Sequence, residues 1–300
     1  MQGKKFALAG AFLLLLSFSL WGWVERLKFE RITTEDGLSQ DSVRALFQDH
    51  HGYIWAATQD GLNRFDGYSF EVFRHDPENP HSLGANFLLS LAEDSRGRLW
   101  AGTALGGLNL YREESGTFQR FLRDPKNSES LWDDTVLSLL SSRSDPDTLW
   151  VGTLSGLNRM DLCAKRVIRI PLGTKKEQGP VNALFEDRKG SLWVGGGDGL
   201  YRLTSPGRAA VFYPLLWKGG DEGKAKGDKV LSIFQDSRGV YWVGTERGLF
   251  RFEPSTGLFH PLFPQVPSLA LSGYSARAIV EDKEGFLWVI TSRRGIASID

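Results

Sequence analysis

Aspartates recur through the chain at positions where they could bind a metal ion. In five places an aspartate stands six residues before a tryptophan: Asp49, Asp94, Asp187, Asp236 and Asp282. Calcium requires about six to eight oxygen ligands from alternating positions of one loop, so one aspartate per loop is too few. A glycine follows each aspartate after three residues. The pattern therefore predicts hairpin turns in which the carboxylate bonds the turn backbone, and no metal site.

The other groups that could do chemistry do not converge in the sequence. His50 and His51 are adjacent, and neighbouring residues of an extended chain point to opposite faces, so they form a poor chelate. A hydrolase needs convergent carboxylates, or a nucleophile beside a base. Most acids are explained by turns, and no Gly-x-Ser-x-Gly motif occurs. We therefore expect no enzyme, no cofactor and no bound metal.

Composition narrows the class of protein. The chain has 36 Lys and Arg against 36 Asp and Glu, without the basic stripe that phosphate neutralisation requires, so nucleic acid is not an expected partner. Its single cysteine, Cys163, excludes an intrachain disulfide. The 34 glycines, 12 prolines, 10 tryptophans and 19 phenylalanines are typical of short strands joined by tight turns. These features favour an all-β protein.

Tryptophans define an internal repeat that would position the aspartates. They occur at Trp55, Trp100, Trp150, Trp193, Trp242 and Trp288, roughly 43–50 residues apart, a period typical of propeller blades. Each unit can be divided into four strands with the tryptophan in the second. We expect the ring to fill the space between neighbouring sheets, because one blade cannot bury its face alone. The sequence thus predicts a β-propeller of six four-stranded blades.

The predicted repeats cover most of the chain after an N-terminal segment. The propeller should span residues 28–300, with repeats at about 28–75, 84–124, 134–170, 179–214, 228–263 and 274–300. The third repeat departs from the pattern, since Ser144 replaces the aspartate and Asp147 replaces the glycine. The last repeat ends after its third strand. A strand predicted at 28–33 either completes that blade in a closed six-bladed ring or belongs to a seventh blade.

Residues 1–23 differ from the rest and predict export. Lys4 and Lys5 precede an uncharged apolar stretch from residue 6 to residue 23, which predicts a hydrophobic helix that is either a signal peptide or a membrane anchor. The positive-inside rule keeps the lysines in the cytoplasm and places residue 24 onward outside. We expect a periplasmic or extracytoplasmic protein, either secreted or held to the inner membrane by this segment.

The candidate binding residues lie on the loops at one face of the predicted propeller. Crossovers between blades reach that face, and residues 76–83 and 124–131 form the same crossover loop twice. Turns between second and third strands open there too, and loops carry recognition more often than strands do. The candidates are Asp60, Trp132, Asp198, Tyr213, Trp217, Arg247 and Arg294. The aromatic candidates either stack on a ligand or cap the core.

Motifs in the first blade resemble a known family. Residues 34–39 (TEDGLS), the stretch from Gln48 through Gly52 to Trp55, and residues 61–67 (GLNRFDG) are similar to those of the two-component regulator propeller. That family supplies extracytoplasmic sensors of hybrid histidine kinases and diguanylate cyclases. The resemblance covers roughly residues 28–300 by the repeat argument. It implies a ligand-sensing propeller of a signalling receptor, with the output domain absent from these 300 residues.

The resemblance leaves the partner open. A small ligand such as a saccharide, a peptide or a metabolite, or another protein, would bind the crossover face. A receptor of this kind is a possible homodimer, and an uncleaved N-terminal helix would hold it to the membrane. The alternative is an exported protein-binding propeller scaffold with no signalling output.

Overall fold

The computed structural model describes residues 31–173, 178–204, 209–215, 228–262, 274–292 and 295–299. The chain divides into two compact units, Met1–Ile32 and Thr33–Asp300, and all of the strands belong to the second. The predicted signal peptide or anchor at 1–23 lies outside the described residues. Within the described part, no helix is long and apolar enough to cross a membrane.

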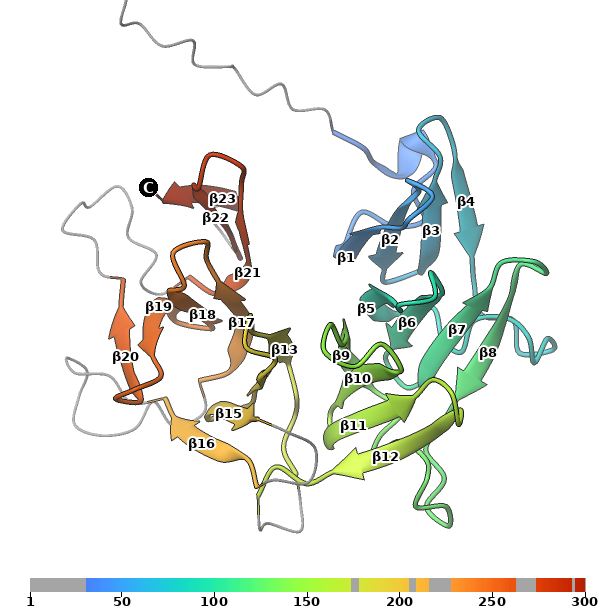
Figure 1. Cartoon of the computed structure of the whole chain (residues 1–300). Helices are drawn as coiled ribbons and strands as arrows, with labels where there is room; N and C mark the ends of the chain where they lie inside the picture. Colours follow the sequence, from blue (N-terminus) through green and yellow to red (C-terminus); the bar gives the residue numbers. More distant parts are fainter. Residues whose placement is uncertain are drawn as a thin grey trace, which may run out of the picture. The chain divides into compact units, whose positions relative to one another are not determined.

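The second unit is an all-β propeller of six antiparallel sheets, numbered 1 to 6 in chain order (Figure 1). A 3-10 helix, η1 (Thr34–Asp36), precedes them. Sheet 1 holds β1 (Val43–Gln48), β2 (Ile54–Thr58), β3 (Gly61–Phe65) and β4 (Phe70–Phe73); sheet 2 holds β5 (Leu88–Glu93), β6 (Leu99–Thr103), β7 (Leu108–Arg112) and β8 (Thr117–Phe121); sheet 3 holds β9 (Val136–Ser141), β10 (Thr148–Thr153), β11 (Gly156–Asp161) and β12 (Arg166–Ile170).

The later sheets repeat the same order of strands. Sheet 4 holds β13 (Ala183–Glu186), β14 (Leu192–Gly195), β15 (Gly199–Leu203) and β16 (Val211–Pro214); sheet 5 holds β17 (Val230–Gln235), β18 (Tyr241–Thr245), β19 (Gly248–Glu253) and β20 (Leu258–Pro261); sheet 6 holds β21 (Ala276–Glu281), β22 (Leu287–Thr291) and β23 (Gly295–Ile299). Five sheets therefore have four strands, and the sixth has three within the described residues.

The Asp-x-x-Gly segments form the turns between first and second strands. In sheet 2, Asp94 Oδ1 accepts hydrogen bonds from the backbone N–H groups of Arg96 and Arg98, at 2.9 and 3.1 Å. Gly97 takes a φ of 73°, a left-handed conformation that glycine adopts without steric cost. The carboxylate thus satisfies donors that the tight turn would otherwise leave unpaired.

The second carboxylate oxygen of the same aspartate holds the repeat tryptophan. Asp Oδ2 accepts the indole Nε1–H six residues later in five sheets, at 2.6 Å from Asp49 to Trp55, 2.8 Å from Asp94 to Trp100, 2.8 Å from Asp187 to Trp193, 2.9 Å from Asp236 to Trp242 and 2.7 Å from Asp282 to Trp288. One side chain therefore fixes both the turn and the orientation of the ring.

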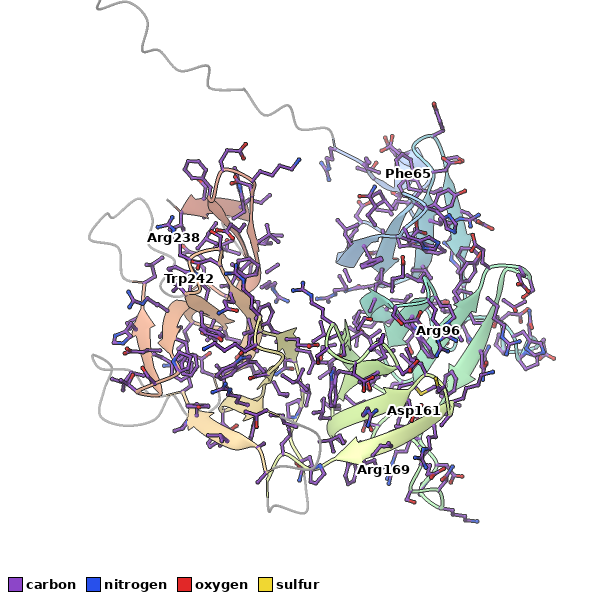
Figure 2. All side chains as sticks on the ribbon, in the orientation of Figure 1. Phe65, Arg96, Asp161, Arg169, Arg238 and Trp242 are labelled. Carbon is purple, nitrogen blue, oxygen red and sulfur yellow. The ribbon has the colours of Figure 1, made fainter. Side chains whose placement is uncertain are left out.

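In sheets 1 to 5 the repeat indole packs against the sheet that follows its own. Trp55 clusters with Leu99, Tyr111 and Phe118 of sheet 2, and its ring meets that of Tyr111 at 5.2 Å between centroids. The same offset recurs down the chain: Trp100 packs with residues of sheet 3, Trp150 with sheet 4, Trp193 with sheet 5 and Trp242 with sheet 6. Trp242 is labelled inside sheet 5 in Figure 2. The core is therefore a series of layers between consecutive sheets.

Serines of the first strands tie neighbouring sheets together near their inner edges. The first strand of each sheet contacts the first strand of the next. Ser138 Oγ donates to the carbonyl of Val181 at 3.0 Å, and Ser90 and Ser232 bond the following sheets in the same way. A Cβ on Gly152 would lie 2.2 Å from Ser138 Oγ. A glycine is therefore required on the second strand for this close approach.

In the third repeat, a glutamate of sheet 4 accepts the hydrogen bonds of the turn between the first and second strands. The connection from Ser142 to Asp147 is longer and differs from the other turns, as its sequence predicted. Glu186 at the end of β13 accepts hydrogen bonds from Ser142 Oγ at 2.9 Å and from the backbone N–H groups of Arg143 and Ser144 at 2.8 and 2.9 Å. These bonds outweigh the burial that raises the pKa of Glu186, so its pKa lies below the usual value.

The first and last sheets leave apolar side chains exposed. Val280, Ile290 and Ile296 of sheet 6 are exposed, and Trp288 on the same face is only half-buried. In sheet 1, Leu46 is exposed as well. The strand predicted at 28–33 is not seen in its described part, since residues 31–33 form no strand and residues 28–30 lie outside the described residues.

These layers predict that the repeat tryptophans differ in their contribution to stability. Trp100→Ala should lower the free energy of unfolding by about 3–5 kcal/mol, because it empties a buried aromatic site. Trp288→Ala should cost less than half as much, because its ring is half-buried, and so should Trp132→Ala. Urea unfolding of residues 24–300 measures all three. Equal losses at Trp100 and Trp288 would contradict the layered packing.

Candidate ligand-binding face

Buried asparagines fix the crossover segments of the first three sheets. Asn63, Asn109 and Asn158 are fully buried on the third strands. Their Oδ1 atoms accept the backbone N–H of Ser39 at 2.8 Å, Gly84 at 2.8 Å and Trp132 at 2.9 Å, and their Nδ2 groups donate to second-strand carbonyls of Ala56, Ala101 and Val151. Each of these segments is therefore held to the sheet that it leads into. Sheets 4 to 6 carry Tyr201, Phe250 and Ala297 at this position.

Arginines of the outermost strands hold the two long crossover loops. Arg120 of β8 donates to the carbonyls of Ser82 at 2.8 Å and Asn79 at 3.0 Å. Arg169 of β12, labelled in Figure 2, donates in the same way to the carbonyl of Ser130 at 2.9 Å. Within each loop a serine closes a turn, since Ser82 Oγ and Ser130 Oγ accept the backbone N–H of Asp76 and Asp124. These loops are thus held by hydrogen bonds in one shape.

Asp60 lies in the β2–β3 turn and joins it to the next crossover. Its Oδ2 accepts from Arg74 Nε and Nη2, both at 3.2 Å, and its Oδ1 accepts from Asn86 Nδ2 at 3.5 Å. Asn86 stands in the crossover to sheet 2, where its own Oδ1 accepts the backbone N–H of His75 at 2.6 Å. With 47% of its side chain exposed, the Asp60 carboxylate can still meet a ligand.

Trp132 is half-buried on the crossover into sheet 3. The guanidinium of Arg169 lies 4.9 Å from its ring centroid, a cation–π distance. A Cβ on Gly156 would be only 3.0 Å from ring atom Cδ1, so the ring covers the β10–β11 turn. Its Nε1–H is buried and has no hydrogen-bond partner among the described residues. The indole caps the edge of sheet 3, while its partner Arg169 holds the crossover loop.

Two candidates lie in sheet 4, where they have different surroundings. Asp198 is exposed in the β14–β15 turn, and its backbone carbonyl accepts Leu215 N–H at 3.1 Å. Tyr213 does not lie on the crossover, where its sequence position suggested it, but on β16. Its ring lies 5.7 Å from Trp193 and 5.3 Å from Phe252 between sheets 4 and 5. Its aromatic face is therefore used in packing.

Arg247 leads to an acid that the sequence reasoning missed. Its Nε lies 3.8 Å from Asp228 Oδ2, and Thr245 Oγ1 donates to that same oxygen at 3.3 Å. The side chain of Asp228 has 0% exposure, and its Oδ1 has no hydrogen-bond partner among the described residues. Burial raises the pKa of Asp228 above the ordinary aspartate value. Nothing in the sequence around Asp228 indicates this burial, which depends on contacts with sheet 5.

The face therefore holds several separate groups rather than one assembled site. Each described candidate bonds within its own sheet or the adjoining crossover: Asp60 with Arg74, Trp132 with Arg169, and Arg247 with Asp228. Trp217 and Arg294 lie outside the described residues. The repeat aspartates that could suggest metal chemistry have their carboxylates engaged by turn N–H groups and indoles.

Two buried aspartates should respond oppositely to neutralisation. Asp228→Asn should raise the free energy of unfolding at pH 7, because the raised folded-state pKa means that its charge costs stability above that pKa. The gain should shrink as the pH falls and wild-type Asp228 takes up a proton. In Asp187, hydrogen bonds from Trp193, Ser191 and Tyr241 outweigh burial and lower the pKa. Asp187→Asn should therefore cost about 1–3 kcal/mol at pH 7.

Urea titrations at pH 7 and at pH 5 measure both variants. The contribution of Asp187 is present above the unfolded-state pKa and is lost only as the pH falls through the lowered folded-state pKa, so its loss should persist at pH 5. Destabilisation by both substitutions at pH 7 would show that Asp228 is a compensated structural acid like Asp187.

Four segments of the chain match the profile of a known family. The profile of the two component regulator propeller family matches residues 37–60, 82–104, 176–198 and 225–247. A curated relative, Histidine kinase P4 of Formosa agariphila, is 43% identical over 68 residues, which are 23% of this chain and 5% of that protein. The chain thus spans only a small part of that relative.

Solved structures share the architecture. The extracellular domain of a putative hybrid two component system from B. thetaiotaomicron matches with a TM-score of 0.74 and 26% identity, over 90% of this chain and 35% of that one. PorZ of the type-IX secretion system of Porphyromonas gingivalis has a TM-score of 0.61 and 17% identity, over 86% and 38% of the two chains. Virginiamycin B lyase from Staphylococcus aureus has a TM-score of 0.63 and 13% identity, over 85% of this chain and 79% of that one. The last two likenesses show the fold alone.

Each matched profile segment includes the aspartate, the glycine and the tryptophan of one repeat, in sheets 1, 2, 4 and 5. The most similar of these structures by TM-score is an extracellular part of a two-component system. Four of the six sheets therefore carry repeats that match the two component regulator propeller family, and the propeller as a whole is similar to that extracellular domain.

Proposed function

We propose that this chain is the extracytoplasmic ligand-sensing propeller of a two-component or cyclic-dinucleotide signalling receptor. The observation that carries the proposal is the 26% identity, over 90% of this chain, with the extracellular domain of a putative hybrid two component system. The 43% identical segment of a histidine kinase supports it. Residues 1–23, with Lys4 and Lys5 before an apolar stretch, would direct the propeller across the inner membrane and either anchor it or be cleaved.

The crossover face is where we expect a ligand to bind. Hydrogen bonds from Arg120, Arg169 and the buried asparagines hold its loops in one shape, and a preorganised surface loses less conformational entropy on binding. Exposed Asp60, Asp198 and Arg247 would supply polar contacts there. Asp228 is buried beside Arg247 and only partly compensated, since its Oδ1 has no hydrogen-bond partner among the described residues; such buried acids are more common at functional sites than elsewhere. A polar ligand such as a saccharide, a peptide or a metabolite fits these groups.

Binding without chemical turnover is the expected mode of action. The repeat aspartates accept hydrogen bonds from indoles and turn amides, which leaves them unsuited to proton transfer with a substrate. Contact on the crossover face would bias the packing between sheets or the geometry of a homodimer, and a membrane helix would relay that change inward. A ligand can shift such an equilibrium only by its difference in affinity for the two states.

The gene beyond codon 300 discriminates signalling from a plain scaffold. The proposal predicts that the reading frame continues into a membrane-spanning helix and a histidine kinase or diguanylate cyclase domain. Sequencing the genomic locus tests this directly. A stop codon immediately after the codon for Asp300 would favour the alternative, an exported propeller that binds another protein and transmits nothing.

The location can be tested on the chain itself. Alkaline phosphatase fused after Asp300 of the full chain should be active in a bacterial host, because that enzyme matures only outside the cytoplasm, while β-galactosidase fused at the same point should be inactive. Replacing Lys4 and Lys5 by glutamate should reduce phosphatase activity, since these lysines set the orientation. The reverse pattern of reporter activities would overturn the extracytoplasmic assignment.

A further inference from the structure

A cavity of about 440 Å³ lies between sheets 2 and 3, away from the crossover face. Its lining comes from the start of β6, the ends of β7 and β11, strand β8, and the β7–β8 and β11–β12 turns. These are the strand ends at which the Asp-x-x-Gly turns stand, whereas the crossovers and the β2–β3 type of turn stand at the opposite ends. Asp161, labelled in Figure 2, marks the end of β11 beside this cavity. The volume of the cavity is typical of small-molecule sites, which measure roughly 300–1,000 Å³.

The inner wall of the cavity is apolar. Trp100, Leu110, Met160 and Leu162 are buried, and Phe121 is partly buried with its ring centroid 5.6 Å from that of Trp100. An apolar or aromatic ligand body would displace water from this wall at a gain of free energy.

The rim of the cavity carries three cations and one acid. Arg98, Arg112 and Lys165 line it together with Glu114. The guanidinium of Arg98 is bound to Asp94 through Nε at 2.8 Å and Nη2 at 2.7 Å, and 28% of its side chain is exposed. Arg112 is exposed and donates to Gln119 Oε1 at 2.7 Å, a neutral partner. Asp94 is buried and offsets Arg98, and the nearby Asp161 carboxylate is engaged by the turn N–H groups of Cys163 and Ala164. Among the residues that line the cavity, positive charge therefore exceeds negative charge.

Lys165 occupies a turn position at which glycine stands in two other sheets. The turns that join the third and fourth strands of sheets 2 and 5 end in Gly116 and Gly257, with φ angles of 64° and 72°. The corresponding turn of sheet 3 ends in Lys165, with a φ of 53°. A left-handed backbone is unfavourable for a side chain other than glycine. Of these three turns, only the one that ends in Lys165 carries this backbone strain, and Lys165 lines the cavity.

We propose that this cavity binds an organic carboxylate with an apolar body, aromatic or short aliphatic. The carboxylate would meet Arg112 and Lys165 at the rim, and the body would lie against Phe121 and Met160. Charge-assisted hydrogen bonds to a carboxylate are stronger than neutral ones, and a partly enclosed site strengthens them further. This site is separate from the crossover face, so it stands or falls independently of the ligand proposed there.

The probe for this site is para-trifluoromethyl-phenylacetate, compared with its neutral amide. Fluorine NMR titration of residues 24–300 should give a dissociation constant for the carboxylate at least tenfold lower than for the amide. Acetate, which lacks the apolar body, should not compete at the same concentration. Equal binding of acid and amide, or no binding of the acid, overturns the proposal.

Three substitutions locate the binding and separate it from folding. Lys165→Gly should weaken binding of the carboxylate at least tenfold while raising the melting temperature, because glycine relieves the left-handed strain. Glu114→Gln should tighten binding two- to threefold by removing a repelling charge. Lys126→Ala, an exposed lysine on the crossover loop, is the matched control and should change neither property. Unchanged affinity in Lys165→Gly would place the probe elsewhere.

Discussion

The interaction on which the propeller depends is the hydrogen bond from the repeat indole to the aspartate six residues before it, which five of the six sheets make. A buried carboxylate is costly unless it is compensated, and here each one accepts the indole and turn N–H groups together. Burial by itself raises the pKa of Asp94, but hydrogen bonds from Arg98, Trp100 and the turn backbone outweigh it and hold the pKa below the usual value. In Asp282 the bond from Trp288 is the main cause of a lowered pKa. The charge is thereby kept, and the ring is aimed at the adjoining sheet.

The spacing of residues predicted the repeat but not the contacts between repeats. Trp100 and Asp94 were recognisable because both recur at a fixed distance, and hairpin turns follow from Asp and Gly chemistry alone. The role of Glu186 could not be assigned from the sequence, because it accepts hydrogen bonds in the preceding repeat, where the aspartate is missing. The buried asparagines were present in the sequence after three Gly-Leu pairs, yet their bonds to the crossovers appear only once the sheets are folded. Tyr213 lies within the repeat predicted at 179–214, on β16, where its ring packs between sheets.

The two halves of the propeller hold their crossovers differently. Sheets 1 to 3 use a wholly buried asparagine whose four hydrogen-bonding positions are largely occupied by backbone. Sheets 4 and 5 place Tyr201 and Phe250 there instead, and Tyr201 has a pKa raised by burial and by Asp198. The buried acid without full compensation, Asp228, lies in this second half.

The offset of the tryptophans has a consequence for how such chains change over evolution. An indole is carried by one copy and covered by its successor, so every internal boundary between consecutive sheets is built on the same pattern. Duplication or loss of one whole unit, taken in register, leaves each remaining indole with a cover of the same kind. Blade number can therefore vary among relatives without a new core being invented. Insertions that shift the register within a unit have no such freedom, because they separate an aspartate from its ring.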